Sequence, residues 1–329
     1  MRVAAIDIGT NTILLLVAER QGDGSLSAVV DRATITRLGE GVDRSRRFTP
    51  AAVARTCACI EEYSRLVRTL GGADRVAVVG TSAMREASGG EEVRDCVSKA
   101  FGVETHIVSG EQEARLAFKG AVSGLAIDSK EETAVFDIGG GSTEVVLGRS
   151  EKGLLSIGYL ESFELGSVRL TERFLAHDPP AESELDALGR TLAQAFSQVP
   201  PLPADRAPVG IAGTMTTLAS VSIGMAAYDG ARLHGKSLAR EELRRTVVRL
   251  ASVDLAARRG VLGMEPKRAD VIVAGGYIAL SLLDHWGARA VTISDRGVRW
   301  GLAEELAGRE NVDFGPPAGP LASKRLQKS

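Results

Sequence analysis

The sequence has few of the residues that mark disulfide scaffolds, nucleic-acid binders or membrane proteins. Only three of its 329 residues are cysteine and 4% are aromatic; so few cysteines, in odd number, are typical of a reducing compartment. The 40 Lys and Arg nearly balance the 42 Asp and Glu, which argues against a nucleic-acid coat or a polybasic membrane binder. No apolar run approaches the roughly 20 residues of a membrane span, and no signal-peptide apolar region follows Met1. We therefore expect a cytoplasmic protein without nucleic-acid or membrane partners.

The cysteines are Cys57, Cys59 and Cys96. Cys57 and Cys59 are two residues apart, but no histidine lies near them to complete a zinc site. We therefore expect buried thiols at Cys57 and Cys59, and three cysteines are too few for a disulfide scaffold.

Strand-like segments are interspersed with helix-like segments, which predicts an α/β protein, and the length suggests about two domains. A Thr-Pro pair at residues 49–50 predicts a helix that runs to about residue 70, and a capping box at 109–112 predicts another. Further helices are predicted over residues 91–101, 182–199, 240–250 and 268–285, and a third strand over 26–38. The predicted domains are 1–127 and 128–310, followed by a disordered tail over 311–329, where Gly, Pro and basic residues gather.

The most informative feature is a repeated pattern of strand, Asp-Ile-Gly, turn and strand. In the first copy, residues 7–12 read Asp-Ile-Gly-Thr-Asn-Thr, and in the second, residues 137–143 read Asp-Ile-Gly-Gly-Gly-Ser-Thr. Each copy opens a plausible half of the chain. The repeat therefore predicts two structurally related domains with a cleft between them.

The two glycine loops are interpreted as tight hairpin turns that bind an anion. A β-like segment follows each loop, whereas a helix follows a dinucleotide-binding loop, and a Walker-type loop is absent from the sequence. Glycine lets successive amides converge on an anion, and a third turn of small residues at 210–214 opens a helix and adds further amides. Taken alone, the first loop and the third turn are equally well explained as ordinary turns. The candidate phosphate-binding residues are Gly9, Thr10, Asn11, Thr12, Gly139, Gly140, Gly141, Ser142, Thr143, Gly213 and Thr214.

Carboxylates flank both loops. Asp7 and Asp137 end the strands before the loops, and Glu144 follows the second loop. A carboxylate repels a bare phosphate, so its place beside an anion cradle is best explained by a bridging Mg²⁺, which prefers oxygen ligands. The sequence predicts a metal site at Asp7, Asp137 and Glu144, with Mn²⁺ as a possible substitute for Mg²⁺.

Six segments, in this order, resemble the exopolyphosphatase/guanosine pentaphosphate phosphohydrolase (Ppx/GppA) family. They are residues 7–12, 80–85, 109–116, 137–144, 212–214 and 268–276. The resemblance implies two ribonuclease-H-like domains of the actin, sugar-kinase and acetate-kinase superfamily, with an active site in the interdomain cleft. It also implies hydrolysis of a terminal phosphoanhydride with Mg²⁺. Longer family members carry additional C-terminal helical domains, whereas this chain resembles the short, two-domain form.

The resemblance also implies roles for single residues. Glu113 matches the family's catalytic base and Arg85 its substrate-contacting arginine, whereas spacing alone does not choose between Glu111 and Glu113. Glu144 matches an acidic residue that holds Mg²⁺ or orients the attacking water. Arg268 is a further candidate for binding the polyanion.

We expect an exopolyphosphatase that releases orthophosphate from the ends of inorganic polyphosphate, with Mg²⁺ and a glutamate general base. The alternative substrate is pppGpp, whose 5′-phosphate would be removed to give ppGpp. Alternatives of other classes are a kinase of the same superfamily, a polyphosphate- or nucleotide-binding sensor, and an actin-like ATPase. A homodimer is the expected oligomer, because relatives dimerise.

Overall fold

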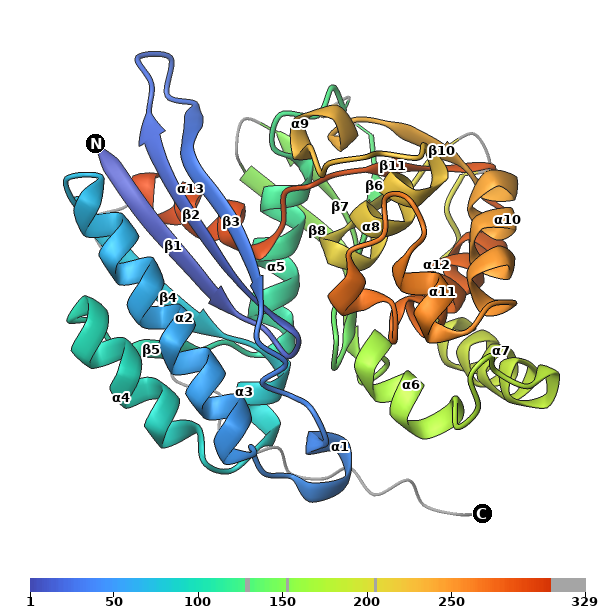
Figure 1. The fold of residues 1–329 in the computed structure, drawn as a ribbon. Helices are drawn as coiled ribbons and strands as arrows, with labels where there is room; N and C mark the ends of the chain where they lie inside the picture. The colour runs from blue at the N-terminus through green and yellow to red at the C-terminus, as the bar shows by residue number, and fades with distance from the viewer. Residues whose placement is uncertain (128–130, 152–153, 204–205, 309–329) are drawn as a thin grey trace, which may run out of the picture.

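Figure 1 shows a computed structural model of the chain, in which two twisted β-sheets are flanked and separated by helices. The structure describes residues 1–127, 131–151, 154–203 and 206–308. The predicted tail over 311–329 and residues 128–130, in a charged segment before β-like residues 133–136, lie outside the described residues. Among the described residues, no helix is both long and apolar enough to cross a membrane.

The two sheets repeat one topology, as the sequence repeat predicts. The first has the order β3-β2-β1-β4-β5 and the second the order β10-β11-β9-β6-β7-β8, so β8-β7-β6-β9-β11 reproduces the first sheet. In each half an antiparallel meander of three strands is followed by two strands parallel to its first strand. The second sheet adds β10, which is antiparallel to β11. The strands are β1 (Arg2–Ile8), β2 (Thr12–Arg20), β3 (Leu26–Ile35), β4 (Arg75–Gly80), β5 (Thr105–Ile107), β6 (Thr133–Ile138), β7 (Thr143–Glu151), β8 (Leu154–Phe163), β9 (Val209–Ile211), β10 (Ser237–Ala239) and β11 (Ala290–Ile293).

The helices begin where the sequence supplies caps. Thr49 accepts a hydrogen bond from the Ala52 amide at 3.2 Å and starts α2, and Ser109 and Gln112 form the predicted capping box of α5. The helices are α1 (Val42–Ser45), α2 (Pro50–Thr69), α3 (Ser82–Glu86), α4 (Gly90–Phe101), α5 (Gly110–Val122), α6 (Ser167–Phe174), α7 (Glu182–Phe196), α8 (Ala212–Ser222), α9 (Gly230–Leu233), α10 (Arg240–Ala251), α11 (Leu255–Arg259), the 3₁₀ turn η1 (Pro266–Arg268), α12 (Ile272–Trp286) and α13 (Val298–Gly308).

Several predicted elements differ from the structure at their ends. The helix predicted over 182–199 ends at Phe196. The third strand ends at Ile35, before the predicted residue 38, because the amides of Thr36 and Arg37 donate to the Asn11 carbonyl. The helix predicted from residue 268 starts at Ile272, since the preceding Pro266–Arg268 segment forms a separate 3₁₀ turn.

Three hydrophobic clusters form the interior. One lies between the first sheet and helices α2 and α4, and another lies between the second sheet and helices that include α7, α8, α10 and α12. The third takes residues from both sheets, from α5 and from α13. Helix α13 packs on β1, β2 and β4, while α5 packs on β6, β7 and β8. The last helix of each half therefore packs on the other half's sheet. The predicted boundary at residues 127 and 128 stays a prediction, and this central core extends across it.

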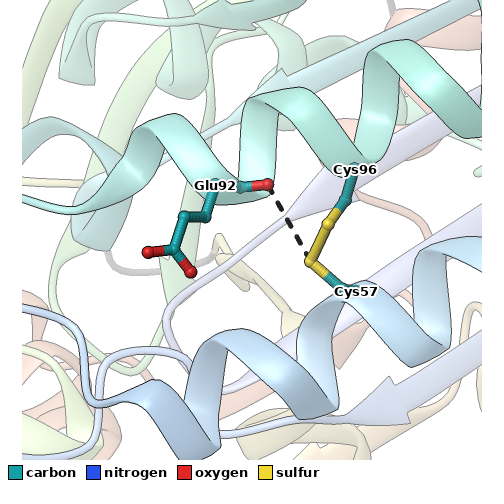
Figure 2. Close-up of a disulfide and its surroundings, with 3 residues drawn as sticks. All are labelled: Cys57, Glu92 and Cys96. Atoms are coloured by element: carbon teal, nitrogen blue, oxygen red, sulfur yellow. Dashed lines mark hydrogen bonds between the residues drawn. A yellow bond between two sulfur atoms is a disulfide. The ribbon is translucent and has the colours of Figure 1, made fainter.

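The prediction of buried thiols is wrong for Cys57 and confirmed for Cys59. Cys57 on α2 and Cys96 on α4 form a disulfide (Figure 2). Cys59 is a buried free thiol. The sequence separation of 39 residues gives no local signal for this pair. The packing of α2 against α4 brings the two side chains together.

Candidate active site

The two glycine loops are built alike. The Gly9 amide donates to the Thr12 carbonyl at 3.1 Å, and the Gly139 amide donates to the Ser142 carbonyl at 3.0 Å. Each loop thus closes a tight hairpin between the first two strands of its half, β1–β2 and β6–β7. The prediction of hairpin turns is confirmed for both.

Helix α6 holds the carbonyls of the second loop. The Ser167 amide donates to Gly139 at 2.9 Å, and the Val168 and Arg169 amides donate to Gly140 at 2.9 and 3.1 Å. Because the carbonyl and the following amide of a trans peptide point in opposite directions, the amides of Gly140 and Gly141 point away from α6. In the part of the chain that the structure describes, neither amide has an acceptor.

The segment after β3 holds the first loop in the same way. The Gly39 amide donates to the Thr10 carbonyl at 2.8 Å, and the Asn11 carbonyl accepts the two amides that end β3. Within the described ranges, the Asn11 side-chain nitrogen is buried without an acceptor. Both loops therefore hold donors that protein groups leave unused, as an anion-binding site requires.

The third turn, at residues 210–214, contacts the end of the strand that precedes the second loop. Thr214 donates through its hydroxyl to the Ile138 carbonyl at 3.2 Å, and the Thr143 hydroxyl donates to the Leu165 carbonyl. These two predicted phosphate-binding hydroxyls are thus used within their own half. Gly213 has no room for a Cβ, which would lie 2.1 Å from the guanidinium carbon of Arg268. Arg268 reaches across the halves to Thr12 at 3.0 Å.

Four buried carboxylates gather next to the loops. Asp137 and Glu144 are directly paired across β6 and β7, and Asp7 occupies on β1 the position that Asp137 occupies on β6. Burial, together with the Glu113 charge, raises the pKa of Asp137 to about 7. Burial and the charges of Glu113 and Asp137 raise the pKa values of Asp7 and Glu144 well above the usual range. The four groups are therefore close enough to repel one another, and this repulsion adds to the cost of burying their charges.

Arg85 and Glu113 join α3 to the start of α5. Arg85 donates to Glu113 at 2.6 Å and to the Val108 carbonyl at 2.9 Å. Burial raises the pKa of Glu113, and the adjacent guanidinium opposes that rise. Glu111, by contrast, is exposed and pairs with Arg115 at 3.4 Å. The structure therefore distinguishes the two glutamates that spacing left equivalent, because only Glu113 faces the carboxylate cluster.

The predicted metal ligands offer the chemistry that Mg²⁺ prefers. Asp7, Asp137 and Glu144 present carboxylate oxygens, and Oδ1 of Asp7 is buried without a hydrogen-bond partner among the described residues. No group of three or more His, Cys, Asp or Glu side chains in those same ranges is arranged to hold a metal by itself. Mg²⁺ is usually held by one or two carboxylates, with substrate phosphates and water as the other ligands. The residues fit that mode.

Sequence reasoning missed three polar side chains beside this cluster. Ser162 on β8 donates to Glu144 at 2.6 Å. Arg299 on α13 lies near Asp7 and Asp137, and its charge partly opposes the rise in their pKa values. It also forms two hydrogen bonds, of 2.6 and 2.9 Å, with Asp31. An arginine within the apolar run of residues 298–303 is the one sequence signal for such a buried ion pair.

One histidine, His234, lies beside an aspartate that is distant in the sequence. Its Nδ1 lies 3.2 Å from a carboxylate oxygen of Asp295. The two residues are 61 positions apart and meet because β11 ends beside α9. This pair binds no second histidine, so the arrangement does not match a binuclear metal site of the His-Asp type.

The Ppx/GppA phosphatase family matches residues 16–310. Exopolyphosphatase 2 of Mycobacterium tuberculosis is 37% identical over 322 residues, covering 93% of this chain and 99% of that protein. Exopolyphosphatase 1 of the same organism is 30% identical over 306 residues, covering 92% and 87%. The crystal structure of the Aquifex aeolicus Ppx/GppA family member has 32% sequence identity and a TM-score of 0.78, covering 93% of this chain and 97% of that one.

Proposed function

The chain belongs to the Ppx/GppA phosphatase family, and from this membership we propose that it is an exopolyphosphatase. It is a hydrolase that acts on phosphoanhydride bonds. In the proposed reaction, water attacks the terminal phosphorus of inorganic polyphosphate, the bond to the bridging oxygen breaks, and orthophosphate and a shortened chain are released. The relatives named exopolyphosphatase support this substrate class.

One observation carries the proposal. Four buried carboxylates, Asp7, Glu113, Asp137 and Glu144, lie beside the two loops. Within the described residues, the Gly140 and Gly141 amides and the Asn11 side-chain amide of these loops have no acceptor. Phosphoryl transfer needs an aligned water, a base near it, and donors or cations that absorb charge on the transferring group. The site offers the base in a carboxylate and the donors in the loop amides.

Glu113 is the proposed general base. Its buried carboxylate has a raised pKa, and a base whose pKa lies nearer the working pH takes a proton more effectively. Arg85, 2.6 Å away, holds this carboxylate in place and has further guanidinium N–H groups with which to contact a phosphate oxygen. Glu113 thus accepts the water proton while Arg85 keeps it oriented.

The loop amides and Arg268 are the proposed phosphate ligands. Gly140, Gly141 and Asn11 provide unused donors, and Arg268 adds a positive charge at the junction of the halves. Bound Mg²⁺ would be held by Asp7, Asp137 and Glu144, with Mn²⁺ as a substitute, and it supplies positive charge that neutralises carboxylate and phosphate oxygens.

A panel of substrates tests the proposal. The purified protein is incubated with Mg²⁺ or Mn²⁺ and with short polyphosphate, long polyphosphate, pppGpp or ATP, and the orthophosphate released is measured. We expect the highest kcat/KM for polyphosphate. A preference for pppGpp would make the chain a pppGpp 5′-phosphohydrolase that uses the same residues, because pppGpp ends in the same phosphoanhydride. Release from none of them would overturn the hydrolase assignment.

The location and the oligomeric state are proposed from the sequence and the family. A cytoplasmic homodimer remains the proposal, and sedimentation analysis of the purified chain tests the dimer. The Cys57–Cys96 disulfide is the observation that weighs against a reducing compartment. Fractionation of cells that express the chain, with thiol trapping of these cysteines, tests the location and the redox state together.

A further inference from the structure

Behind the triple-glycine loop, α6 carries an arginine whose side chain is only 5% exposed. Besides its backbone contact, Arg169 donates from Nε to the Gly141 carbonyl at 2.7 Å. That bond turns a third consecutive loop carbonyl toward α6. Because the Gly141 carbonyl and the Ser142 amide belong to one trans peptide, this bond points the Ser142 amide away from α6, in the same way as those of Gly140 and Gly141.

The other end of the same guanidinium crosses to the first half of the chain. Arg169 donates to Asp43 on α1 at 2.6 Å and to both oxygens of Glu86 on α3 at 2.6 and 2.7 Å. Arg173 also pairs with Asp43, and Arg46 pairs with Glu86. Burial and hydrogen bonding to charged partners make such bonds stronger than neutral ones. One side chain thus ties the loop of the second half to two helices of the first.

The space enclosed by these groups is too small for substrate. The cavity bounded by the loops, α1, α3 and α6 has a volume of about 20 Å³, enough for about one water molecule. A Cβ at Gly141 would lie 2.4 Å from the Ser82 hydroxyl and 2.9 Å from that of Thr10. At this edge, a polyphosphate end can enter between the loops only if the halves separate.

The first half carries a counterpart to Arg169. The backbone of Arg37 donates to the Asn11 carbonyl of the first loop. Its side chain crosses to the second half, where it pairs with Asp270 at 2.8 Å and donates to the Lys267 carbonyl at 2.9 Å. Each half therefore places one arginine behind its own loop and pairs it with the other half. Arg37 is more exposed, so Arg169 is the stronger of the two links.

We propose that Arg169 is a positioning residue that holds the two halves closed and, through the Gly141 carbonyl, sets the orientation of the loop amides for phosphate. Substrate entry at this edge requires its bonds to Asp43 and Glu86 to break, and the oriented amides hold the bound phosphate tightly only once these bonds reform. This inference rests on the proposed function for its kinetic part alone, since the link between the halves exists with or without turnover.

Two measurements on the full chain test this role. Small-angle X-ray scattering without substrate reports the separation of the halves, and steady-state kinetics with polyphosphate report KM and kcat. For Arg169→Met we expect a larger radius of gyration and a kcat/KM lower by about tenfold or more, mainly through KM. Arg169→Lys keeps the charge but cannot serve three acceptors at once, so it should fall between Arg169→Met and the wild type.

Two further variants separate this role from general damage to the fold. Arg44→Met removes an exposed arginine at the same edge, whose contact with Glu172 is 3.5 Å long, and it should match the wild type in both measurements. Glu86→Gln leaves Arg169 in place and should open the halves as Arg169→Met does. Wild-type values of KM and radius of gyration in both Arg169→Met and Glu86→Gln would overturn the proposal. A wild-type protein that hydrolyses nothing would overturn the proposed function and leave the scattering test intact.

Discussion

Glu113 and Glu111 lie two residues apart on α5, and their environments predict different behaviour. Glu113 is buried against Arg85, and Glu111 is exposed on the opposite side of the helix. We expect Glu113→Gln to fold normally and to lose at least about 100-fold in kcat, because the amide cannot accept the water proton. Glu111→Gln is the matched control and should retain wild-type turnover. Near-normal turnover in Glu113→Gln would shift the base to Glu144.

The ionised carboxylate of Asp137 is expected to lower the unfolding free energy of the chain. Its pKa is raised to about 7, so the folded chain binds this proton more tightly than the unfolded chain does. The stability that the bound proton supplies is present at low pH and is lost as the pH rises through about 7. In the absence of Mg²⁺ at pH 8, the unfolding free energy of Asp137→Asn should therefore exceed that of the wild type by roughly 1–4 kcal/mol. The variant should also have the higher melting temperature.

Thermal denaturation at pH 4 and pH 8 in a chelator measures this difference. The two proteins should converge at pH 4, where the wild-type carboxyl is also protonated. Added Mg²⁺ should raise the melting temperature of the wild type more than that of Asp137→Asn. A variant that is less stable than the wild type at pH 8 would contradict the idea that these carboxylates repel one another.

At the scale of elements, the crossing of α5 and α13 depends on two glycines. A Cβ at Gly301 would lie 2.0 Å from the Leu116 carbonyl oxygen, and a Cβ at Gly120 would lie 2.1 Å from that of Gly297. Gly301→Ala should destabilise the chain by about 1–3 kcal/mol, because the helix backbones must move apart. Gly308→Ala on the same helix meets nothing within 4 Å and should be neutral or slightly stabilising. Denaturant unfolding compares the two; equal stability would refute the close crossing.

The disulfide between α2 and α4 predicts a redox-dependent stability. Closing a loop of 39 residues restricts the unfolded chain, so reduction or Cys57→Ser should lower the unfolding free energy by about 2–4 kcal/mol. Thermal unfolding with and without dithiothreitol measures the effect. Dithiothreitol should leave Cys57→Ser unchanged, since that variant cannot form the Cys57–Cys96 disulfide and keeps Cys59 and Cys96 as free thiols. An equal effect of dithiothreitol on both proteins would show that the disulfide does not carry the stability.

At the scale of the whole molecule, the exchanged helices predict one cooperative unit. The central hydrophobic cluster contains residues of both sheets, with α5 and α13 between them (Figure 1). A fragment of residues 1–127 lacks α13, so the face of the first sheet that α13 covers would be exposed to solvent. A large exposed apolar surface promotes unfolding or association. We expect calorimetry of the full chain to give a single transition whose calorimetric and van't Hoff enthalpies agree. Two separated transitions, or a monomeric and cooperatively folded fragment 1–127, would contradict this expectation.

Local patterns in the sequence determined the parts of this protein that depend on short-range physics. Turn glycines, helix caps and the repeated Asp-Ile-Gly segment act over a few residues, so the two hairpin loops, the helix starts at Thr49 and Ser109 and the relatedness of the two halves could be predicted. The ordered motifs also predicted the family. These features need no knowledge of which distant segments meet.

Only the tertiary structure decided what depends on contacts between distant residues. Arg299 meets Asp31 across 268 positions, and Arg169 meets Glu86 across 83. The Cys57–Cys96 bond, the exchange of the last helices and the burial of Glu113 instead of Glu111 likewise follow from packing. Such contacts arise because apolar faces are buried together, and the polar groups carried into that interior must then find partners in whichever segment arrives beside them.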